Sequence, residues 1–206
     1  MKVILVNGSP HEKGCTYTAL CEVEKALQKN GIETEIFWVG NKPISGCIGC
    51  GACGKLGKCF MEDTVNVFAE KAQSADGFVF GSPVHYASAS GAITSFMDRA
   101  FYSAGRYLKG KPAACAVSCR RGGTTATFDM LNKYFTINSM PVVSSQYWNQ
   151  VHGSTPEQVL RDEEGMQTMR TLGSNMAWLL KCIDAGKAAG IEFPEAEPVI
   201  RTNFIR

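Results

Sequence analysis

The sequence contains no long apolar run. A membrane-spanning helix needs about 18 or more consecutive apolar residues, and no stretch of the 206 residues approaches that length. The opening MKVILVNGSP has only five apolar residues before Asn7, too few for the apolar core of a secretory signal peptide. We therefore expect a cytoplasmic protein that contacts no membrane.

The chain also lacks a charge excess, internal repeats and low-complexity segments. Its 21 Lys and Arg residues nearly balance 19 Asp and Glu residues, the net charge is +2, and no basic run resembles a nucleic-acid-binding arm. Hydrophobic residues make up 45% and charged residues 19%, as in ordinary globular proteins. We therefore expect one globular domain with no nucleic-acid partner.

Several catalytic and nucleotide-binding signatures are absent. There is neither a G-x-G-x-x-G dinucleotide fingerprint nor a G-x-x-x-x-G-K-[ST] triphosphate loop. No Ser-His-Asp, paired-carboxylate or H-E-x-x-H arrangement indicates hydrolysis, so the sequence identifies no general acid or base. Cysteine, by contrast, is abundant, and nine thiols in a reducing compartment favour metal or redox chemistry over a disulfide scaffold.

Apolar runs alternate with amphipathic segments along most of the chain. Runs typical of strands buried on both faces occur at 2–6, 33–39, 77–83, 112–119 and 140–145. Helical patterns occur at 16–31, 63–76, 89–102, 124–137 and 155–186. Asp63 and Thr155 are the expected N-caps of two of these helices. The alternation predicts an α/β fold in which a five-stranded parallel sheet carries helices on both faces.

Three segments depart from this alternation. The predicted domain spans residues 1–186, with a cysteine-rich loop inserted at 44–60. Residues 187–206 carry two prolines and no clear period, which predicts an extended tail lying on this subunit or a neighbour. The aromatic segment 145–153 has two interpretations: Tyr147 and Trp148 pack into the core or a dimer contact, or they form a lid over a ligand.

The loop NGSPHEKGCTYT joins the first strand to the first helix. Its glycines permit a tight turn, Ser9, Thr16 and Thr18 offer hydroxyl donors, and the helix N-terminus adds free amides and partial positive charge. These features predict a site for a single phosphate monoester. The alternative is an N-cap turn that binds no ligand.

Two further polar loops follow the third and fourth predicted strands. GSPVHYASASG (81–91) places flat side chains after one strand, and SCRRGGTT (118–125) follows the next. Ligands of open α/β sheets bind at the carboxyl edge of the strands, so the three loops would enclose a phosphate and a planar ring. Taken singly, His85 is equally consistent with a surface histidine and Tyr86 with a packing aromatic.

These loops carry a family resemblance. GSPHEKGCTYTAL, GSPVHYASASGAITSFMDR and the strand–helix order resemble the NADPH-dependent FMN reductase family, which has a doubly wound, flavodoxin-like fold with strand order 2-1-3-4-5. GCIGCGACGKLGKC narrows the resemblance to the iron–sulfur flavoprotein-like branch. The similarity covers roughly residues 1–150, and it implies FMN as cofactor.

The resemblance also implies which residues hold FMN. The phosphate would lie against Ser9, His11, Cys15, Thr16, Tyr17 and Thr18. The isoalloxazine ring would lie between Ser82, Pro83, Val84, His85 and Tyr86 on one side and Ser118, Arg121, Gly122 and Gly123 on the other. His11 stands where the family often has arginine and Cys15 where it often has asparagine, which weakens the individual phosphate contacts but not the loop.

Four cysteines, Cys47, Cys50, Cys53 and Cys59, follow the spacing C-x2-C-x2-C-x5-C. Structural zinc sites usually draw two cysteine pairs from well-separated knuckles, whereas these thiols are crowded into one loop. The resemblance to iron–sulfur flavoproteins implies a [4Fe–4S] cluster, and five loop glycines would expose amides toward its sulfurs. Zinc, free thiols and a disulfide remain alternatives. The other cysteines (Cys15, Cys21, Cys115, Cys119 and Cys182) are interpreted as buried small hydrophobes.

These observations together predict an FMN-dependent oxidoreductase. The donor would be NAD(P)H, or reduced ferredoxin acting through the cluster, and the acceptor a small quinone, flavin, nitro or azo compound, or an oxygen species. His85 and Tyr86 would lie nearest that acceptor. The alternative is a non-enzymatic electron carrier or redox sensor, although a sequence pI near 8.0 is unlike the acidic flavodoxin-type carriers. The resemblance and the tail predict a homodimer or homotetramer.

Overall fold

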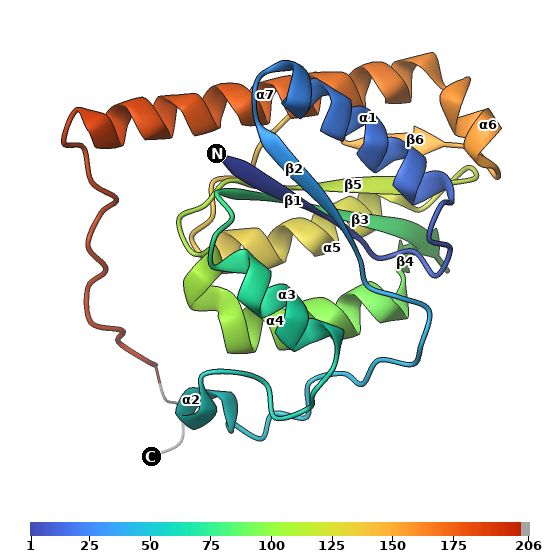
Figure 1. The fold of residues 1–206 in the computed structure, drawn as a ribbon. Helices are drawn as coiled ribbons and strands as arrows, with labels where there is room; N and C mark the ends of the chain where they lie inside the picture. Colours follow the sequence, from blue (N-terminus) through green and yellow to red (C-terminus); the bar gives the residue numbers. More distant parts are fainter. Residues whose placement is uncertain (203–206) are drawn as a thin grey trace.

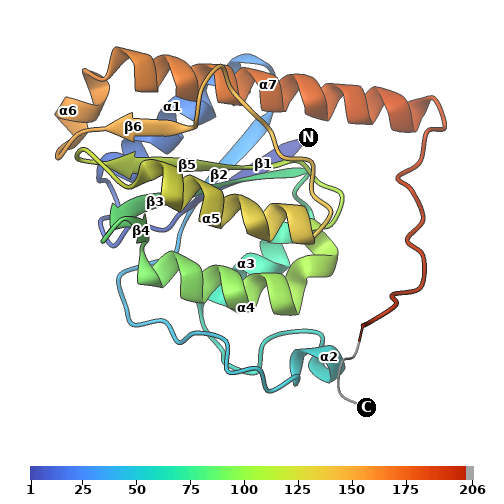
Figure 2. The ribbon, with the colours of Figure 1, turned by 180° about the vertical axis from the view of Figure 1, so that it is seen from behind.

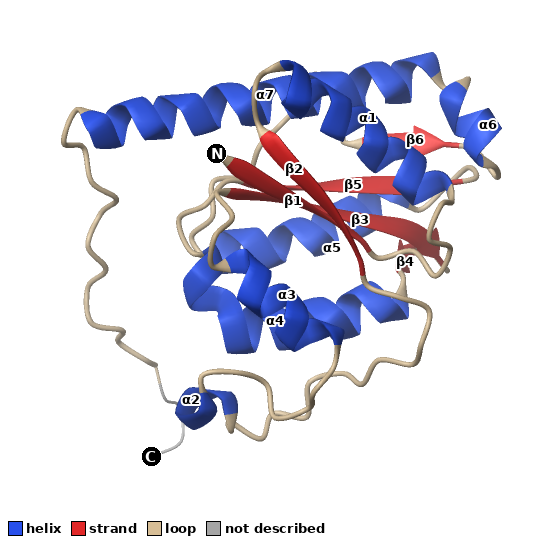
Figure 3. Cartoon of the chain, viewed as in Figure 1, coloured by secondary structure: helices blue, strands red, loops and turns tan. Residues whose placement is uncertain are grey.

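Residues 1–202 are described by a computed structural model of the chain, with a parallel sheet at its centre (Figures 1 and 3). The strands are β1 (Lys2–Asn7), β2 (Glu33–Trp38), β3 (Gly77–His85), β4 (Ser88–Ala89), β5 (Ala113–Cys119) and β6 (Gln150–His152). Five of them are parallel in the order β2-β1-β3-β5-β6, and β4 pairs antiparallel with the end of β3. The predicted strand order 2-1-3-4-5 is therefore confirmed.

Helices cover both faces of the sheet (Figures 1 and 2). They are α1 (Cys15–Lys29), α2 (Cys53–Leu56), α3 (Thr64–Ala72), α4 (Gly91–Leu108), α5 (Thr124–Ile137), α6 (Pro156–Leu160) and α7 (Glu163–Ala188). One face packs against α1 and α7, and the other packs against α3, α4 and α5. No helix among residues 1–202 is long and apolar enough to span a bilayer.

The side chains of β1 show why helices must cover both faces of the sheet. Val3 and Leu5 belong to the core under α1 and α7, whereas Ile4 and Val6 belong to the core under α3, α4 and α5. All four side chains are fully buried, and each such burial contributes about 1.5–3 kcal/mol. The second core is aromatic, and the Phe68 ring lies 5.2–6.1 Å from four other phenylalanine rings.

The fifth strand differs from its prediction. Residues 140–145 make only an isolated bridge, in which Val143 donates to the Ala113 carbonyl, before the chain leaves the sheet. It rejoins the sheet as β6, where Val151 pairs with Ser118. The excursion is stabilised locally, because the Ser145 hydroxyl bonds to the Asn149 side chain 2.7 Å away. The prediction of one strand at 140–145 was wrong because this polar turn splits the pairing in two.

The last predicted helix is also divided. Thr155 caps α6 and Pro156 stands in its first turn, as expected, but α6 ends at Leu160. Asp162 then caps α7 by accepting from Gly165, and it also accepts from the backbone of His152 in β6. A single side chain therefore starts α7 and attaches it to the edge strand, which helical periodicity alone does not reveal.

Beyond α7, residues 191–202 form no helix or strand. The ring of Phe193 lies against the turn after α4, where a Cβ on Gly110 would be 3.1 Å from it. The remainder of the predicted tail, residues 203–206, lies outside the described residues.

The contact between α1 and α7 depends on a glycine. A Cβ added at Gly173 would lie 2.6 Å from the Val23 carbonyl oxygen and 2.7 Å from the Ala26 Cβ. Neither neighbour is the end of a flexible side chain, so the two helices would have to separate. On the same helix, a Cβ at Gly186 would meet nothing closer than 3.8 Å.

We predict that Gly173→Ala lowers the free energy of unfolding by about 1–3 kcal/mol, the usual cost of overpacking. Gly186→Ala is the matched control, and its better helix propensity should leave stability unchanged or raise it by up to about 1 kcal/mol. Urea unfolding followed by circular dichroism measures both. Equal effects of the two substitutions would contradict the packing argument.

Candidate functional site

The loops that follow β1, β3 and β5 meet at the carboxyl edge of the sheet. The Gly8 amide donates to the Gly81 carbonyl at 2.9 Å, which joins the first loop to β3. The hydroxyls of Thr16 and Ser118 are 2.8 Å apart, which joins the start of α1 to the end of β5. The three predicted loops therefore form one continuous surface.

Internal hydrogen bonds hold the β1–α1 loop in shape. The Asn7 side chain accepts from the Ser9 amide and donates to the Glu12 carbonyl at 2.8 Å. The Trp38 indole donates to the Ser9 carbonyl at 2.8 Å, and the Ser9 hydroxyl accepts from the His11 amide. The loop is thus preorganised by contacts from its own residues and from the end of β2.

Two of the helices that begin at this edge, α1 and α5, lack side-chain caps. Helices α3, α4, α6 and α7 each begin with an Asp, Ser or Thr side chain that accepts a backbone N–H. Helices α1 and α5 instead begin after Gly14 and Gly123, which offer no such acceptor. First-turn amides at both ends therefore stay available, and such amides together with the helix dipole favour an anion.

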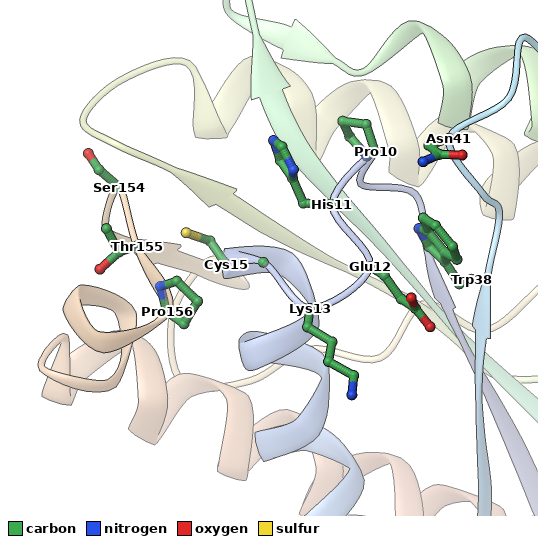
Figure 4. A pocket seen from close by; sticks show the side chains of 11 residues that line it. Pro10, His11, Glu12, Lys13, Cys15, Trp38, Asn41, Ser154, Thr155 and Pro156 are labelled. Carbon is green, nitrogen blue, oxygen red and sulfur yellow. The ribbon is translucent and has the colours of Figure 1, made fainter.

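A cavity of about 590 Å³ opens beside the α1 end (Figure 4). The β1–α1 loop lies between Trp38 and Asn41 on one side and Ser154–Pro156 on the other. The volume of the cavity lies within the usual range for small-molecule sites. Of the residues implied by the resemblance, His11 and Cys15 line it. The residues from β2 and from the segment after β6 were missed, although both segments end at the predicted binding edge.

Most hydroxyls predicted as phosphate donors are already engaged. Thr16 bonds to Ser118, Thr18 donates to the Gly14 carbonyl, and Ser9 accepts from the loop backbone. The hydroxyl of Tyr17 bonds to the Cys21 thiol, which raises the pKa of the phenol. The Ser9 hydroxyl, which accepts a bond but donates none within residues 1–202, and the backbone amides of the first helical turn are therefore the donors that this loop leaves for an anion.

Cys15 is a protonated thiol in this setting. It donates to the Gly153 carbonyl at 3.6 Å, and burial raises the pKa of the thiol. It therefore joins α1 to the segment after β6, and it supplies no negative charge that would repel a phosphate.

The loop after β3 is a tight hairpin. Val84 pairs with Ala89 and His85 with Ser88, which leaves a two-residue turn at Tyr86 and Ala87. Both turn residues have positive φ, 50° and 59°, which a two-residue hairpin turn of type I′ requires but which non-glycine residues adopt uncommonly. The Tyr86 side chain is fully exposed, so it is not a packing aromatic in this chain.

The residues at the base of this hairpin are less exposed. Pro83 and Val84 are half-buried and His85 is exposed. Ser82 is buried, accepting from the Ser90 amide and donating to the Pro83 carbonyl. Ser82 therefore shapes the loop, whereas Pro83, Val84 and His85 remain accessible to a ring.

The loop after β5 supports the hairpin through a glycine. Gly123 has φ of 91°, and a Cβ there would lie 2.6 Å from the Ala87 Cα. The hairpin tip therefore rests directly on the start of α5, a contact that only glycine permits. Arg121 and Gly122 are exposed beside it, whereas Ser118 is buried under the loop.

The segment that carries the four clustered cysteines, residues 44–60 with α2, lies on the far side of α4 from the sheet (Figures 1 and 2). Cys47, Cys50, Cys53 and Cys59 line one pocket of about 90 Å³, together with Arg99 and Tyr102 of α4. Among residues 1–202, no three His, Cys, Asp or Glu side chains are grouped to hold a single metal ion. All four thiols thus line one space beside α4.

The loop glycines allow this winding path. Gly49, Gly51 and Gly57 have φ of 66°, 69° and 71°, which disfavours most other residues. Lys58 pairs with Glu62, and Lys55 is exposed.

A buried arginine holds the cysteine loop. The Arg99 side chain is 1% exposed, and its guanidinium forms a bidentate pair with Asp63. It also donates from Nε to the Cys59 sulfur at 3.3 Å. Burial disfavours its charge, but the hydrogen bonds that Arg99 donates to Asp63 and Cys59 outweigh burial and hold the pKa of Arg99 above its usual range.

Asn66 fixes the backbone of the same cysteine. Its side chain accepts from the Cys59 amide at 3.1 Å and donates to the Cys59 carbonyl at 2.9 Å. Cys59 is accordingly 8% exposed, whereas Cys47 and Cys50 are exposed and Cys53 is intermediate. The pocket thus contains one rigid, buried thiol, that of Cys59, and its other three thiols are more accessible.

Cysteines elsewhere follow their prediction only in part. Cys115 and Cys119 are buried, and burial raises the pKa of both thiols. Cys15 and Cys21 are partly buried, but Cys182 is exposed on α7, so its assignment as a buried hydrophobe was wrong. The helical pattern of α7 did not reveal that this position faces away from α1.

The aromatic segment before β6 is not part of the core. The ring centroids of Tyr147 and Trp148 lie 4.8 Å apart with the ring planes tilted by 49°, and both side chains are about half exposed. The prediction that they pack into the core was wrong because the polar turn at Ser145–Asn149 carries them out of the sheet.

Known proteins share this architecture. Solved structures with a similar fold include RosB with a bound riboflavin-5'-phosphate derivative, with a TM-score of 0.70 at 16% identity, covering 100% of this chain and 92% of that one. Another is an NAD(P)H:quinone oxidoreductase from Methanothermobacter marburgensis, with a TM-score of 0.64 at 14% identity, covering 85% and 96%. At these identities the likeness shows the fold alone.

Sequence relatives are more informative. An iron–sulfur flavoprotein of Methanocaldococcus jannaschii is 34% identical over 191 residues, covering 89% of this chain and 99% of that protein. One of Archaeoglobus fulgidus is 30% identical over 193 residues, covering 87% and 97%. Residues 1–154 match the family described as NADPH-dependent FMN reductase. The chain therefore belongs to the NADPH-dependent FMN reductase family, whose FMN cofactor makes it a flavin-dependent oxidoreductase.

Proposed function

We propose that this protein passes electrons from a reduced donor to a small acceptor through FMN, and that a [4Fe–4S] cluster bound by Cys47, Cys50, Cys53 and Cys59 takes part. The observation that carries the cluster is the single pocket that all four thiols line. Four thiolates are the usual ligands of such a cluster. The names of the curated relatives support the same assignment.

The pocket geometry favours a cluster over a single zinc ion. Sulfur ligands of one zinc ion lie about 2.3 Å from it and must crowd around one point. Here the thiols surround a cavity whose opposite wall is α4. The Nε–H of Arg99 donates to the sulfur of Cys59, and metal ligands are commonly oriented by such hydrogen bonds from neighbouring residues.

FMN fits the carboxyl edge of the sheet. Its phosphate is suited to the uncapped end of α1, and its ring to the surface between the β3–β4 hairpin and the loop before α5. When bound, FMN supplies the one- and two-electron chemistry. The chain's own residues orient it: the Trp38 and Asn7 hydrogen bonds set the phosphate loop, and Gly123 sets the hairpin.

A different electron donor suits each of the two proposed sites. NAD(P)H would act at the exposed ring surface, in keeping with the family description. Reduced ferredoxin would act at the cysteine pocket, where Cys47 and Cys50 are exposed. Quinones, free flavin, nitro and azo compounds and oxygen species are the acceptor classes that an open ring surface admits, and the exposed side chains of His85 and Tyr86 would lie nearest them.

We predict about four irons and four sulfides per FMN after anaerobic purification. Cys50→Ser should lose at least half of the iron and keep its FMN, because Cys50 is an exposed member of the pocket remote from the flavin loops. Cys182→Ser is the matched control, an exposed thiol on α7 that should keep full iron content. Iron, sulfide and flavin assays measure the three proteins, and flavin without iron in the wild type would refute the cluster.

We predict that Gly14→Asp weakens FMN binding at least about tenfold, or about 1.4 kcal/mol. Gly14 has extended backbone (φ −89°, ψ −161°), so an aspartate there would cap α1 and occupy the amides proposed for the phosphate. Riboflavin, which has no phosphate, should lose much less affinity. Flavin fluorescence titrations of the apoprotein measure both ligands, with Gly14→Ala as the uncharged control. Equal losses for FMN and riboflavin would contradict the phosphate assignment.

The two donor routes should respond differently to loss of the cluster. In Cys50→Ser, reduced ferredoxin should reduce FMN at least about tenfold more slowly, because the proposed route through the cluster is lost. Reduction by NADPH should stay within about twofold of the wild type, because hydride transfer needs only the flavin. Anaerobic stopped-flow absorbance measures both rates. Undiminished reduction by ferredoxin would show that the cluster is not its entry point.

A further inference from the structure

The guanidinium of Arg99 uses every one of its N–H groups. Nη1 and Nη2 together bond to both Asp63 oxygens and to the carbonyls of Ser45 and Met61. The fifth N–H, on Nε, points at the sulfur of Cys59, 3.3 Å away. An arginine carries five such donors in a fixed fork, so this set leaves none for water. A charged side chain that is 1% exposed requires pairing of this kind.

The contact with sulfur distinguishes Cys59 from the other three cysteines. Cys53 donates its own thiol to the Tyr102 carbonyl, so its neighbour there is an acceptor. Among residues 1–202, Arg99 is the one side chain that donates a hydrogen bond to a sulfur of this pocket. The donor is also cationic, and it lies in a dry environment where charge interactions are least screened.

We infer that Arg99 tunes the reduction potential of the cluster by stabilising its reduced state through Cys59. This inference rests on the proposed cluster. Reduction adds negative charge to the iron and sulfur atoms, and hydrogen bonds to the sulfurs together with nearby positive charge favour the more negative state. Asp63 offsets part of the arginine charge, but the guanidinium lies between the carboxylate and the sulfur, so the sulfur faces the positive group.

The hydrogen bond from Arg99 makes Cys59 unlike the other three proposed ligands. Asn66 fixes the backbone of Cys59 and Arg99 fixes its sulfur, whereas Cys47 and Cys50 are exposed. Arg99 therefore acts as a positioning and tuning residue at the buried corner of the pocket. A purely structural anchor of the loop would affect cluster content and not its potential, so the two roles are separable.

The test compares Arg99→Lys and Arg99→Gln with Arg106→Lys. Arg106 is the matched control because it lies on the same helix and contacts the same loop, but it donates to the Gly57 carbonyl and not to a sulfur. Each protein is purified anaerobically with its FMN, and iron and sulfide are quantified. The midpoint potential of the cluster is then measured by titration followed by electron paramagnetic resonance.

We expect Arg99→Lys to lower the midpoint potential of the cluster by about 59 mV for its one-electron reduction. At a fixed potential, this corresponds to an about tenfold smaller ratio of reduced to oxidised cluster. Arg99→Gln, which also removes the charge, should shift it at least as far. Arg106→Lys should leave it unchanged, as should the FMN potential in all variants. Fully loaded Arg99 variants with an unchanged cluster potential, or an equal shift in Arg106→Lys, would overturn the inference.

A measurement on unsubstituted protein covers the case in which the Arg99 variants fail to fold or load. Protein labelled with ¹⁵N-arginine is reduced, and pulsed paramagnetic resonance is used to look for nitrogen coupled to the cluster, with labelled Arg106→Lys as control. Coupling that persists in the control supports the contact, and absence of coupling overturns it. Wild-type protein without iron would overturn the cluster itself and this inference with it, whereas loaded protein without coupling overturns only the inference.

Discussion

The parallel pairing of β1 with β3, and of β3 with β5, is the constraint on which both sites depend. Parallel strands end at the same edge, so the loops after them converge without any further signal. The Gly8–Gly81 and Thr16–Ser118 hydrogen bonds then lock the loops together. The pairing is stable because β1 is buried on both faces, with alternate side chains in two separate cores.

Helix α4 connects the two sites. At its start, the Ser90 hydroxyl donates to the Gly8 carbonyl and the Ser90 amide donates to the Ser82 hydroxyl, which fixes two of the loops proposed to hold FMN. Nine residues later, or about 13 Å along the axis, Arg99 fixes the cysteine loop. A single rigid helix therefore sets the position of one site relative to the other, and its aromatic packing against α3 and the sheet resists bending.

The candidate sites were only partly predictable. The C-x2-C-x2-C-x5-C spacing identified the cysteines that line one pocket, because a short loop cannot separate them widely. The spacing could not identify Arg99, which lies 40 residues beyond Cys59 in an amphipathic helix where an arginine normally faces water. Similarly, the hydroxyls of Thr16 and Thr18 looked like ligand donors, but folding gives each of them a partner within the protein.

The sequence by itself determined the alternation of most strands and helices, the parallel sheet and the loops predicted to carry the chemistry, whereas the strand order was implied by the family resemblance. It did so because apolar runs and glycine-rich loops are local features whose meaning does not depend on distant residues. Tertiary structure alone decided where the edge strand breaks around Ser145–Asn149, how Gly123 supports the hairpin, and why Arg99 is buried. The last two features arise from pairs of residues far apart in the chain, Gly123 with Ala87 and Arg99 with Cys59, and a local pattern carries no record of the partner.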